Sequence, residues 1–228
     1  YEEPLLDGYS FVINSNEILP HVKLDLSLGS VRDSAQIKLA DNSTALVVVD
    51  HGLETSGGYS SWPFGDVWIV SEKNNALMSD MVSNVKGFYH SVSVGDLNSD
   101  TLDDILTLHM GTKGHSDFNL SAFIQQPNST FHKKNIFTEV VKEQDSGGAV
   151  KIADLDGDGK NEIIVGRYVP DSVSDLVGFS ILSANNNQYD TIMNFSREGS
   201  FEVFGVTTAE VIDFDLDGDL DLIFALQG

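Results

Sequence analysis

The clearest chemical pattern in the sequence is a set of carboxylates that alternate along a short glycine-containing loop. Asp154, Asp156 and Asp158 stand two residues apart in the stretch DLDGDGKNEIIV. A calcium ion takes about six to eight oxygen ligands, and carboxylates at alternate positions of a tightly curled loop can all face one ion. The backbone carbonyl of Lys160 and the carboxylate of Glu162 complete the expected ligand set. The sequence therefore predicts a calcium loop that runs from Asp154 to Glu162.

This loop differs from the calcium loop of a helix-loop-helix module. In an EF-hand the closing glutamate is at about position 12 and the loop lies between two helices. Here the closing Glu162 comes earlier and is followed at once by Ile163, Ile164 and Val165. Since β-branched residues favour strands, the loop is expected to join two strands of a sheet.

The same pattern occurs twice more along the chain. One copy, DFDLDGDLD, precedes an apolar stretch and supplies Asp213, Asp215, Asp217, Asp219 and Asp221 as expected ligands. The other copy, DLNSDTLDD, supplies Asp96, Asn98, Asp100, Leu102 and Asp104, with the leucine contributing its carbonyl. In that earlier copy a threonine replaces the second glycine, so we expect its calcium site to be the weakest of the three.

A shortened relative of these loops follows Asp41 in KLADNSTALVVVD, and it is too short to surround a metal. Asp and Gly are also common in ordinary turns, which is the alternative explanation for any single loop. Three copies at nearly equal spacing make that alternative unfavourable. We therefore expect two calcium sites and a weaker third, and none at Asp41.

The spacing of the four loops defines an internal repeat. Asp41, Asp96, Asp154 and Asp213 are separated by 55, 58 and 59 residues. Each period reads as four short strands, although the fourth strand is less well defined, as ALMSDMV in the first period and IFTEVV in the second. A helix is the alternative for ALMSDMV. Four-stranded antiparallel units at fixed spacing are typical of a β-propeller. The predicted fold class is all-β, with calcium loops between the first and second strands of each blade.

Three segments carry a resemblance to a known family. FYHSVSVGDLNSDTLDDILTLHMG, GGAVKIADLDGDGKNEIIVGRY and FGVTTAEVIDFDLDGDLDLIFALQG resemble the FG-GAP or VCBS-type calcium repeats of integrin α-chains and bacterial secreted proteins. The resemblance implies a propeller that binds calcium. It implies little about function, because such propellers serve as adhesion modules, lectins and appendages of enzymes.

The number of blades is inferred from the two ends of the chain. The stretch GYSFVINSNEILPHVKLDL is similar to GFSILSANNNQYDTIMNF, which reads as the last two strands of a blade. We therefore expect one domain over residues 1–228 with four blades, comprising residues 30–86, 87–144, 145–203, and 204–228 together with 1–29. The alternative is a part of a seven-bladed propeller.

Candidate ligand-binding residues follow from the opposite ends of the same strands. Residues after the second strand of each blade should gather on the face away from the calcium loops, and the long loop HGLETSGGYSSWPFGD adds aromatic side chains there. The expected ligand-binding residues are Asp50, His51, Tyr59, Trp62, His90, His109, Arg167 and Tyr168. The alternatives are that these residues are solvated loop residues or fill the channel with hydrogen bonds, and that the aromatic side chains of the loop pack onto the neighbouring blade.

Composition narrows the possible environment and partners. The net charge of -22 argues against nucleic acid and anionic membrane surfaces as partners. The chain has no cysteine, which excludes disulfides and thiol chemistry, and no apolar run of the length that a membrane span needs. Open calcium sites function where calcium is abundant, so we expect a secreted or cell-surface protein, bacterial in type.

Three functions are compatible with these observations. The leading expectation is a calcium-stabilised module that binds a carbohydrate or a surface protein. One alternative is a polysaccharide lyase or hydrolase, in which histidine, tyrosine and arginine would act as base and charge stabiliser. The other is a structural subunit that associates with itself. No catalytic motif was found, so the enzyme is the less favoured of these.

Overall fold

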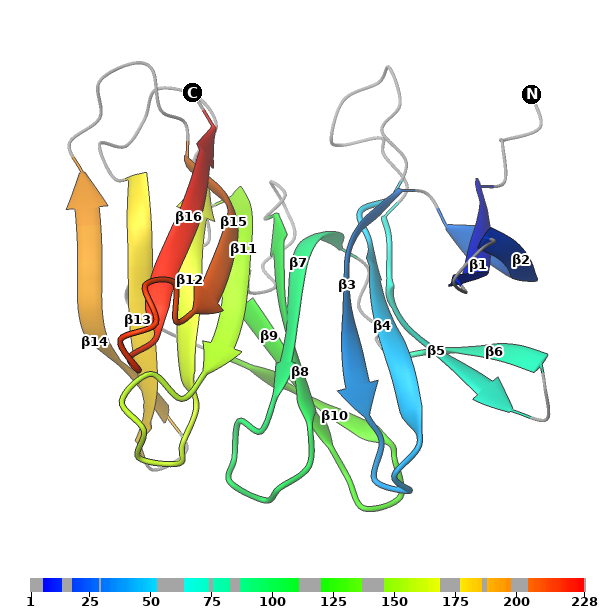
Figure 1. Ribbon diagram of the computed structural model, residues 1–228, viewed down its shortest axis with the longest axis horizontal. Coiled ribbons are helices and arrows are strands. Elements are labelled where there is room, and N and C mark those ends of the chain that lie inside the picture. The colour runs from blue at the N-terminus through cyan, green and yellow to red at the C-terminus, as the bar shows by residue number, and fades with distance from the viewer. Residues whose placement is uncertain are drawn as a thin grey trace.

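The structure is a computed structural model that describes residues 6–13, 18–28, 30–52, 64–73, 76–82, 87–110, 120–136, 146–168, 177–185, 188–197 and 205–227. Over these ranges the protein is all-β, with 16 strands in four antiparallel sheets and no helix (Figure 1). Accordingly, the described part contains no helix that could cross a membrane. The prediction of an all-β fold is confirmed.

Three of the sheets contain a run of four strands in which each strand pairs with the next in sequence. The first sheet comprises β3 (Val31–Lys38), β4 (Thr44–Asp50), β5 (Val67–Lys73) and β6 (Ala76–Met81). The second comprises β7 (Phe88–Gly95), β8 (Asp104–Met110), β9 (Leu120–Gln125) and β10 (Phe131–Asn135). The third comprises β11 (Ser146–Ala153), β12 (Glu162–Tyr168), β13 (Val177–Asn185) and β14 (Gln188–Arg197). These three runs coincide with the repeats expected from the sequence.

Two further pairs of strands complete the fold. β15 (Gly205–Ile212) pairs with β16 (Asp221–Gln227) and joins the third sheet through a single pairing between Tyr168 and Gly205. β1 (Leu6–Ile13) and β2 (Ile18–Leu28) form a separate two-stranded sheet.

The sequence predicted the fourth strand of the first repeat at the right place, but not that of the second. β6 includes most of ALMSDMV and confirms that prediction. In the second repeat the strand that follows β9 is β10, ahead of the predicted stretch IFTEVV, whose residues 137–141 lie outside the described residues. A tight turn explains the earlier position: Ser129 has a φ of 60°, and Asn128 Oδ1 accepts a hydrogen bond of 2.7 Å from the Thr130 hydroxyl. This turn folds the chain back directly after β9.

The first strands of successive repeats lie beside one another and are joined by side-chain hydrogen bonds. Asp33 Oδ2 on β3 accepts the Val92 amide hydrogen on β7 at 3.0 Å. Ser93 Oγ on β7 accepts the Ile152 amide hydrogen on β11 at 3.0 Å, and Lys151 on β11 pairs with Glu210 on β15 at 3.2 Å. The four sheets are thus arranged in the order of the sequence, as Figure 1 shows.

The hydrophobic core lies between adjacent sheets. Val47 and Val49 of the first sheet pack with Ile105 and Phe123 of the second. The opposite face of the second sheet packs against the third in the same way. Because successive side chains of a strand point to opposite faces, an inner sheet that is covered on both sides has apolar residues at consecutive positions. β12 shows this pattern, because Ile163, Ile164 and Val165 are consecutive, apolar and buried.

Glycine permits the closest approach between the third sheet and β15. A Cβ atom built on Gly166 would lie 2.4 Å from Val206 Cγ1, a separation that side-chain atoms do not tolerate. A Cβ on Gly148 would lie 2.2 Å from the carbonyl oxygen of Gly166. These two glycines therefore set how tightly β15 can pack.

We expect Gly166→Ala to destabilise the protein by about 1–3 kcal/mol, the usual cost of adding a methyl group to a fully packed contact. Gly87→Ala is the matched control, since a Cβ at Gly87 would have its nearest neighbours at an ordinary distance of 3.5 Å. Chemical denaturation of the two variants measures the difference. Equal stabilities would contradict the close packing of β15.

The N-terminal hairpin does not occupy the position that ring closure requires. The expected pairing of residues 1–29 with the last repeat would place β1 beside β16. Among the described strands, β1 pairs with β2 alone and β2 lies against β6. Figure 1 shows the hairpin and β16 well apart along the longest axis of the molecule. Closure by this hairpin is therefore not formed in this structure.

Candidate metal centres

Three of the turns between the first and second strands of a repeat have the same hydrogen-bonded geometry. They join β7 to β8, β11 to β12 and β15 to β16. In each, the carboxylate at the ninth position accepts the amide hydrogen of the second residue. These bonds are 2.9 Å from Leu97 to Asp104, 3.0 Å from Leu155 to Glu162 and 2.9 Å from Phe214 to Asp221. The last ligand position thus clamps the start of the loop.

The backbone of the three loops is left-handed at the fourth and sixth positions. In the loop 154–162 these positions are Gly157 and Gly159, with φ of 75° and 84°. In the other loops non-glycine residues also adopt positive φ, Leu216 at 64° and Thr101 at 71°. Few residues other than glycine, asparagine and aspartate take this conformation readily. Leu216 and Thr101 adopt positive φ although their side chains disfavour it, so the curled backbone is set by the whole loop and not by glycine alone.

The alternate carboxylates are turned to the inside of this curl. Asp154 Oδ2 accepts the Gly159 amide hydrogen at 2.9 Å, and Asp213 Oδ2 accepts the equivalent Gly218 amide hydrogen at 3.1 Å. Asp158 Oδ1 accepts the amide hydrogen of Lys160 at 2.8 Å. The same bonds connect Asp217 with Asp219, at 3.0 Å, and Asp100 with Leu102, at 2.9 Å. The seventh position, expected to offer its carbonyl, is thereby fixed in all three loops.

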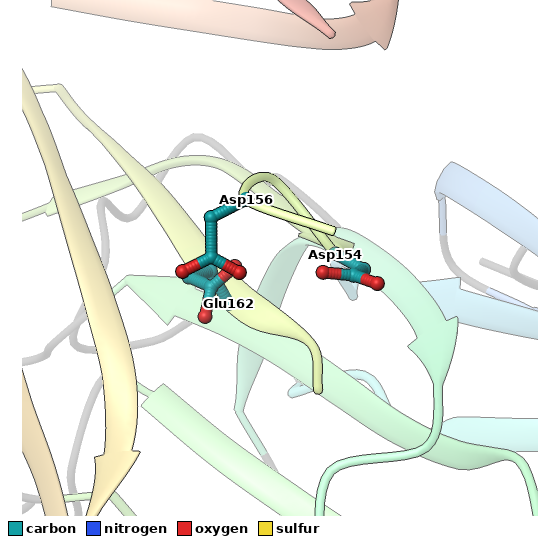
Figure 2. A group of neighbouring side chains, drawn as sticks. All are labelled: Asp154, Asp156 and Glu162. Atoms are coloured by element: carbon teal, nitrogen blue, oxygen red, sulfur yellow. The ribbon is translucent and has the colours of Figure 1, made fainter. Parts of the chain in front are cut away.

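Two of the loops gather three carboxylates closely enough to bind one ion. Asp154, Asp156 and Glu162 each have an oxygen within 4.8 Å of the others, and Figure 2 shows these carboxylates on the inside of one loop. Asp213, Asp215 and Asp221 form the second group. An acidic group of this kind could hold a metal ion.

The donor set of the loop 154–162 fits calcium. Every side chain offered is an oxygen donor, and the carboxylates of Asp156 and Asp158 lie on an exposed, curled backbone. Asp154 Oδ1 is buried and has no hydrogen-bond partner among the described residues. Because an unpaired buried carboxylate oxygen is costly, a cation at this position would remove a penalty that the loop otherwise carries.

The loop 96–104 differs from the other two. Asn98 replaces the aspartate at the third position, and its Nδ2 donates a hydrogen bond of 3.0 Å to Asp100 Oδ2. Asp104 is fully buried, and its second oxygen accepts the amide hydrogen of Gln125 at 2.8 Å. Burial raises the pKa of Asp104 to about 6, and the charges of Asp100 and Asp96 act in the same direction. The amide of Asn98 thus balances part of the carboxylate charge that a cation could balance in the other two loops.

The turn at Asp41 is an ordinary tight turn. Asp41 Oδ1 accepts hydrogen bonds from the amide and the hydroxyl of Ser43, at 2.9 and 2.6 Å. Asn42 takes the left-handed conformation, with φ of 67°. This geometry is that of an Asx turn, in which the carboxylate binds the backbone and hydroxyl of its own turn. The absence of a calcium site at Asp41 stays a prediction.

Side chains that the sequence analysis did not single out tie these loops to neighbouring sheets. Asn161 Nδ2 donates to the carbonyl oxygen of Asp96 at 2.8 Å, and the Tyr189 hydroxyl donates to the carbonyl oxygen of Leu97 at 3.2 Å. Gln125 donates from Nε2 to the Asp103 carbonyl at 2.6 Å, and its Oε1 accepts the Ala40 amide hydrogen at 2.7 Å. The one sequence signal for these contacts was a polar residue at the eighth position of two loops, Asp103 and Asn161.

At the opposite ends of the strands, the structure brings three of the expected ligand-binding residues together. The rings of His51 and His90 meet edge to face with centroids 4.7 Å apart. His109 packs against Tyr89 with centroids 5.4 Å apart, and its charge acts on His90. His51 and His109 are buried rather than exposed at a channel mouth. This histidine cluster, His51 with His90 and His109, lies between the first and second sheets.

The other expected ligand-binding residues are placed as follows. Asp50 is buried, and its Oδ1 accepts the amide hydrogens of Ser30 and Gly52 at 2.7 and 2.8 Å, so it holds the backbone after β4. Arg167 and Tyr168 stand at the end of β12. Tyr59 and Trp62 lie outside the described residues.

The histidine cluster predicts a pH dependence of stability. Burial, with His51, Arg32 and His109 adding to it, lowers the pKa of His90 from 6.5 to about 4. The unfolded chain therefore binds a proton below about pH 6.5 that the folded protein binds only near pH 4, so stability decreases as the pH falls through this window.

We expect His90→Phe to flatten the melting temperature between pH 6.5 and pH 4 relative to the wild type. Both proteins carry the same carboxylates, so the difference between their curves reports His90. The experiment is made in excess calcium to keep the loops in one state. Parallel curves would show that His90 is charged in the folded protein.

Comparison with known proteins gave no assignment for this chain. No protein-family model matches the sequence, and no curated protein matches it significantly.

Proposed function

We propose that this protein is a calcium-stabilised β-propeller module that binds a carbohydrate or another protein. The observation that carries the proposal is the common geometry of the three loops, in which the alternate carboxylates face inward over a backbone of fixed curl. Calcium is the cation whose ligand number and tolerance of irregular geometry such loops suit best. Two loops are full sites, and the loop 96–104 is a weaker one.

The propeller is supported by the order of the strands. Three successive four-stranded antiparallel sheets pack face to face, and their first strands lie side by side in sequence order. A propeller arranges its blades in this way around a central axis. The spacing of the loops and their resemblance to FG-GAP and VCBS-type repeats point in the same direction.

The kind of calcium site proposed here supports an extracellular location. Each loop is open to solvent over its middle residues, as the exposure of Asp156 and Asp158 illustrates. Open sites of this kind have modest affinity and are filled at the calcium concentrations found outside cells. The absence of cysteine from the sequence agrees with a bacterial surface protein.

We expect removal of calcium to lower the melting temperature by about ten degrees or more. A ligand at a hundredfold excess over its dissociation constant stabilises the folded state by about 2.7 kcal/mol per site. Two sites then contribute about 5 kcal/mol, and each kcal/mol corresponds to about 2–4 °C for a chain of this size. Melting curves in calcium and in excess chelator measure the shift, and identical curves would refute the calcium assignment.

The substitution Asp156→Asn tests the site at one residue. It removes one charge from the cluster without changing its shape, so we expect a higher melting temperature in chelator and a smaller gain on adding calcium. Asp41→Asn is the matched control, because Asp41 sits in the turn where no site is expected and an asparagine can accept the same bonds. Equal effects of the two substitutions would contradict a metal at Asp156.

The ligand-binding prediction is tested at Arg167, at the end of β12 away from the loop 154–162, and at Trp62, which lies outside the described residues. We expect Trp62→Ala and Arg167→Ala to weaken binding to a positive glycan or protein by at least about 1 kcal/mol, while leaving the melting temperature unchanged. Ile192→Ala, on the exposed outer strand β14, is the control. A glycan array identifies the ligand, and an assay for reducing ends or unsaturated products on the positives would reveal turnover. Normal binding by both variants would place the ligand elsewhere.

A further inference from the structure

The loops 96–104 and 154–162 belong to neighbouring sheets and are joined by a direct hydrogen bond. Asn161 Nδ2 donates to the carbonyl oxygen of Asp96 at 2.8 Å. Asp96 is the first residue of its loop and an expected calcium ligand. Asn161 stands between the last two residues of the expected ligand set in the other loop. One side chain therefore connects the end of one candidate site with the beginning of the other.

The backbone around this hydrogen bond is closely packed. A Cβ atom built on Gly95, which precedes Asp96, would lie 2.7 Å from Ile152 Cγ2, a separation that real Cβ atoms do not show. The same Cβ would lie 3.6 Å from Asn161 Nδ2. Ile152 belongs to β11, the strand that leads into the second of these loops. The start of the first loop thus packs against that strand, and a shift of one backbone would displace the other.

A second hydrogen bond from the third sheet holds the next peptide of the loop 96–104. The Tyr189 hydroxyl donates to the carbonyl oxygen of Leu97 at 3.2 Å, and both residues are buried. Asp104 Oδ2 accepts the Leu97 amide hydrogen at 2.9 Å, and Asp104 is the last expected ligand of this loop. The two donors from the third sheet therefore fix backbone that lies beside both the first and the last expected ligand.

The loop 96–104 is also the more costly of the two loops to order. Ser99 and Thr101 take the left-handed conformation, with φ of 62° and 71°. At the same positions the loop 154–162 has glycines, which adopt this conformation without a steric penalty. Other side chains disfavour it. Contacts that hold the loop 96–104 from outside therefore lower the cost of ordering it around an ion.

The third loop lacks this connection to the loop before it. The eighth position is Asn161 in the loop 154–162 and Leu220 in the loop 213–221. A leucine side chain has no hydrogen-bond donor, so Leu220 cannot make the equivalent bond to the carbonyl oxygen of Asp154. By this route the chain has one connected pair of loops and one unconnected pair.

We propose that Asn161 couples two of the candidate calcium sites, so that an ion in the loop 154–162 raises the calcium affinity of the loop 96–104. The residues on both sides of Asn161 are expected ligands, so its backbone is fixed once its own loop is filled. Asn161 then holds the carbonyl of Asp96 in place, and the loop 96–104 loses less conformational freedom when it binds an ion. This coupling rests on the calcium function proposed above and makes the weaker site depend on a stronger one.

Charge acts in the opposite direction. An ion in one loop reduces the negative potential at the other loop and so lowers its affinity for a second cation. Salt screens this repulsion, with a screening length of about 8 Å at 0.15 M and about 3 Å at 1 M ionic strength. The hydrogen bond joins residues in direct contact and acts over a shorter range. Positive coupling that persists at high salt therefore distinguishes the hydrogen bond from charge.

The test follows calcium binding at each loop of the full chain by nuclear magnetic resonance. The amide signals of each loop report its own filling, so each loop gives a midpoint calcium concentration. Asn161→Leu removes the donor and copies the leucine of the third loop. We expect the midpoint of the loop 96–104 to rise by at least about fivefold, the lower end of usual coupling between sites, at about 1 M salt. The loop 213–221 is the internal control, and its midpoint should not change.

Asp156→Ala tests the same coupling with the hydrogen bond intact. It removes an exposed ligand from the loop 154–162, so that this loop fills only at higher calcium. The loop 96–104 then binds its ion beside an empty neighbour, and its midpoint should rise by the same factor as in Asn161→Leu. The double variant should show no further rise, because both substitutions interrupt one connection. A merely structural role of Asn161 would instead give two independent effects that add.

Contrary results separate the coupling from the calcium function. An unchanged midpoint of the loop 96–104 in Asn161→Leu, or a loop 96–104 that binds no calcium, would overturn the coupling alone. Loops that do not respond to calcium in the wild type would refute the calcium function itself. A rise that disappears at about 1 M salt, or that is equal in the loop 213–221, would overturn a role of Asn161. If Asn161→Leu does not fold, an unchanged midpoint in Asp156→Ala overturns the coupling.

Discussion

The structure depends on holding like charges together at three turns. Each of these loops brings several carboxylates to the inside of one curl, and in the loop 154–162 three of them have oxygens within 4.8 Å of one another. Amide hydrogens of the loop backbone offset part of the repulsion, as between Asp154 and Gly159. A cation bound by the carboxylates could offset the remaining repulsion. Since each loop joins the first two strands of a sheet, the charge balance of the loop also sets the alignment of those strands.

Local patterns predicted the loops and the strands around them. Alternating carboxylates and glycines predict a curled acidic loop from a few consecutive residues, so the loop 154–162 could be predicted from the sequence. The β-branched run after Glu162 identified β12 in the same way. Longer-range features were not predictable. The bond from Asn161 to the Asp96 carbonyl joins residues of different sheets, and no spacing in the sequence signals it.

Turn chemistry and burial account for the other differences. β10 was placed too late because the turn at Asn128 was not recognised as the point of return. The sequence grouped Asp50 with the ligand-binding residues on the basis of its position alone. Its carboxylate is instead saturated by the amide hydrogens of Ser30 and Gly52, and position along a strand does not reveal whether a polar group is already satisfied. His51 and His109 illustrate the same point, because their rings contribute to packing between sheets.

The two ends of the strands are therefore stabilised by different physical means. At one end, Glu162 and its equivalents organise backbone amides around charge. At the other end, aromatic and imidazole rings such as Phe88 and His51 fill the space between sheets. We expect the first kind to respond to metal concentration and the second to pH.

The uncharged side chain of Gln125 joins the first and second sheets by hydrogen bonds. Its Nε2 donates to the carbonyl oxygens of Lys38 and Asp103, and its Oε1 accepts the Ala40 amide hydrogen. An uncharged amide performs this task with no dependence on ions. If the loops 154–162 and 213–221 hold calcium, as proposed, its removal would loosen the later sheets, whereas the bonds of Gln125 would still join the first and second sheets. A protease arriving in calcium-poor surroundings would accordingly trim this protein from the C-terminal side.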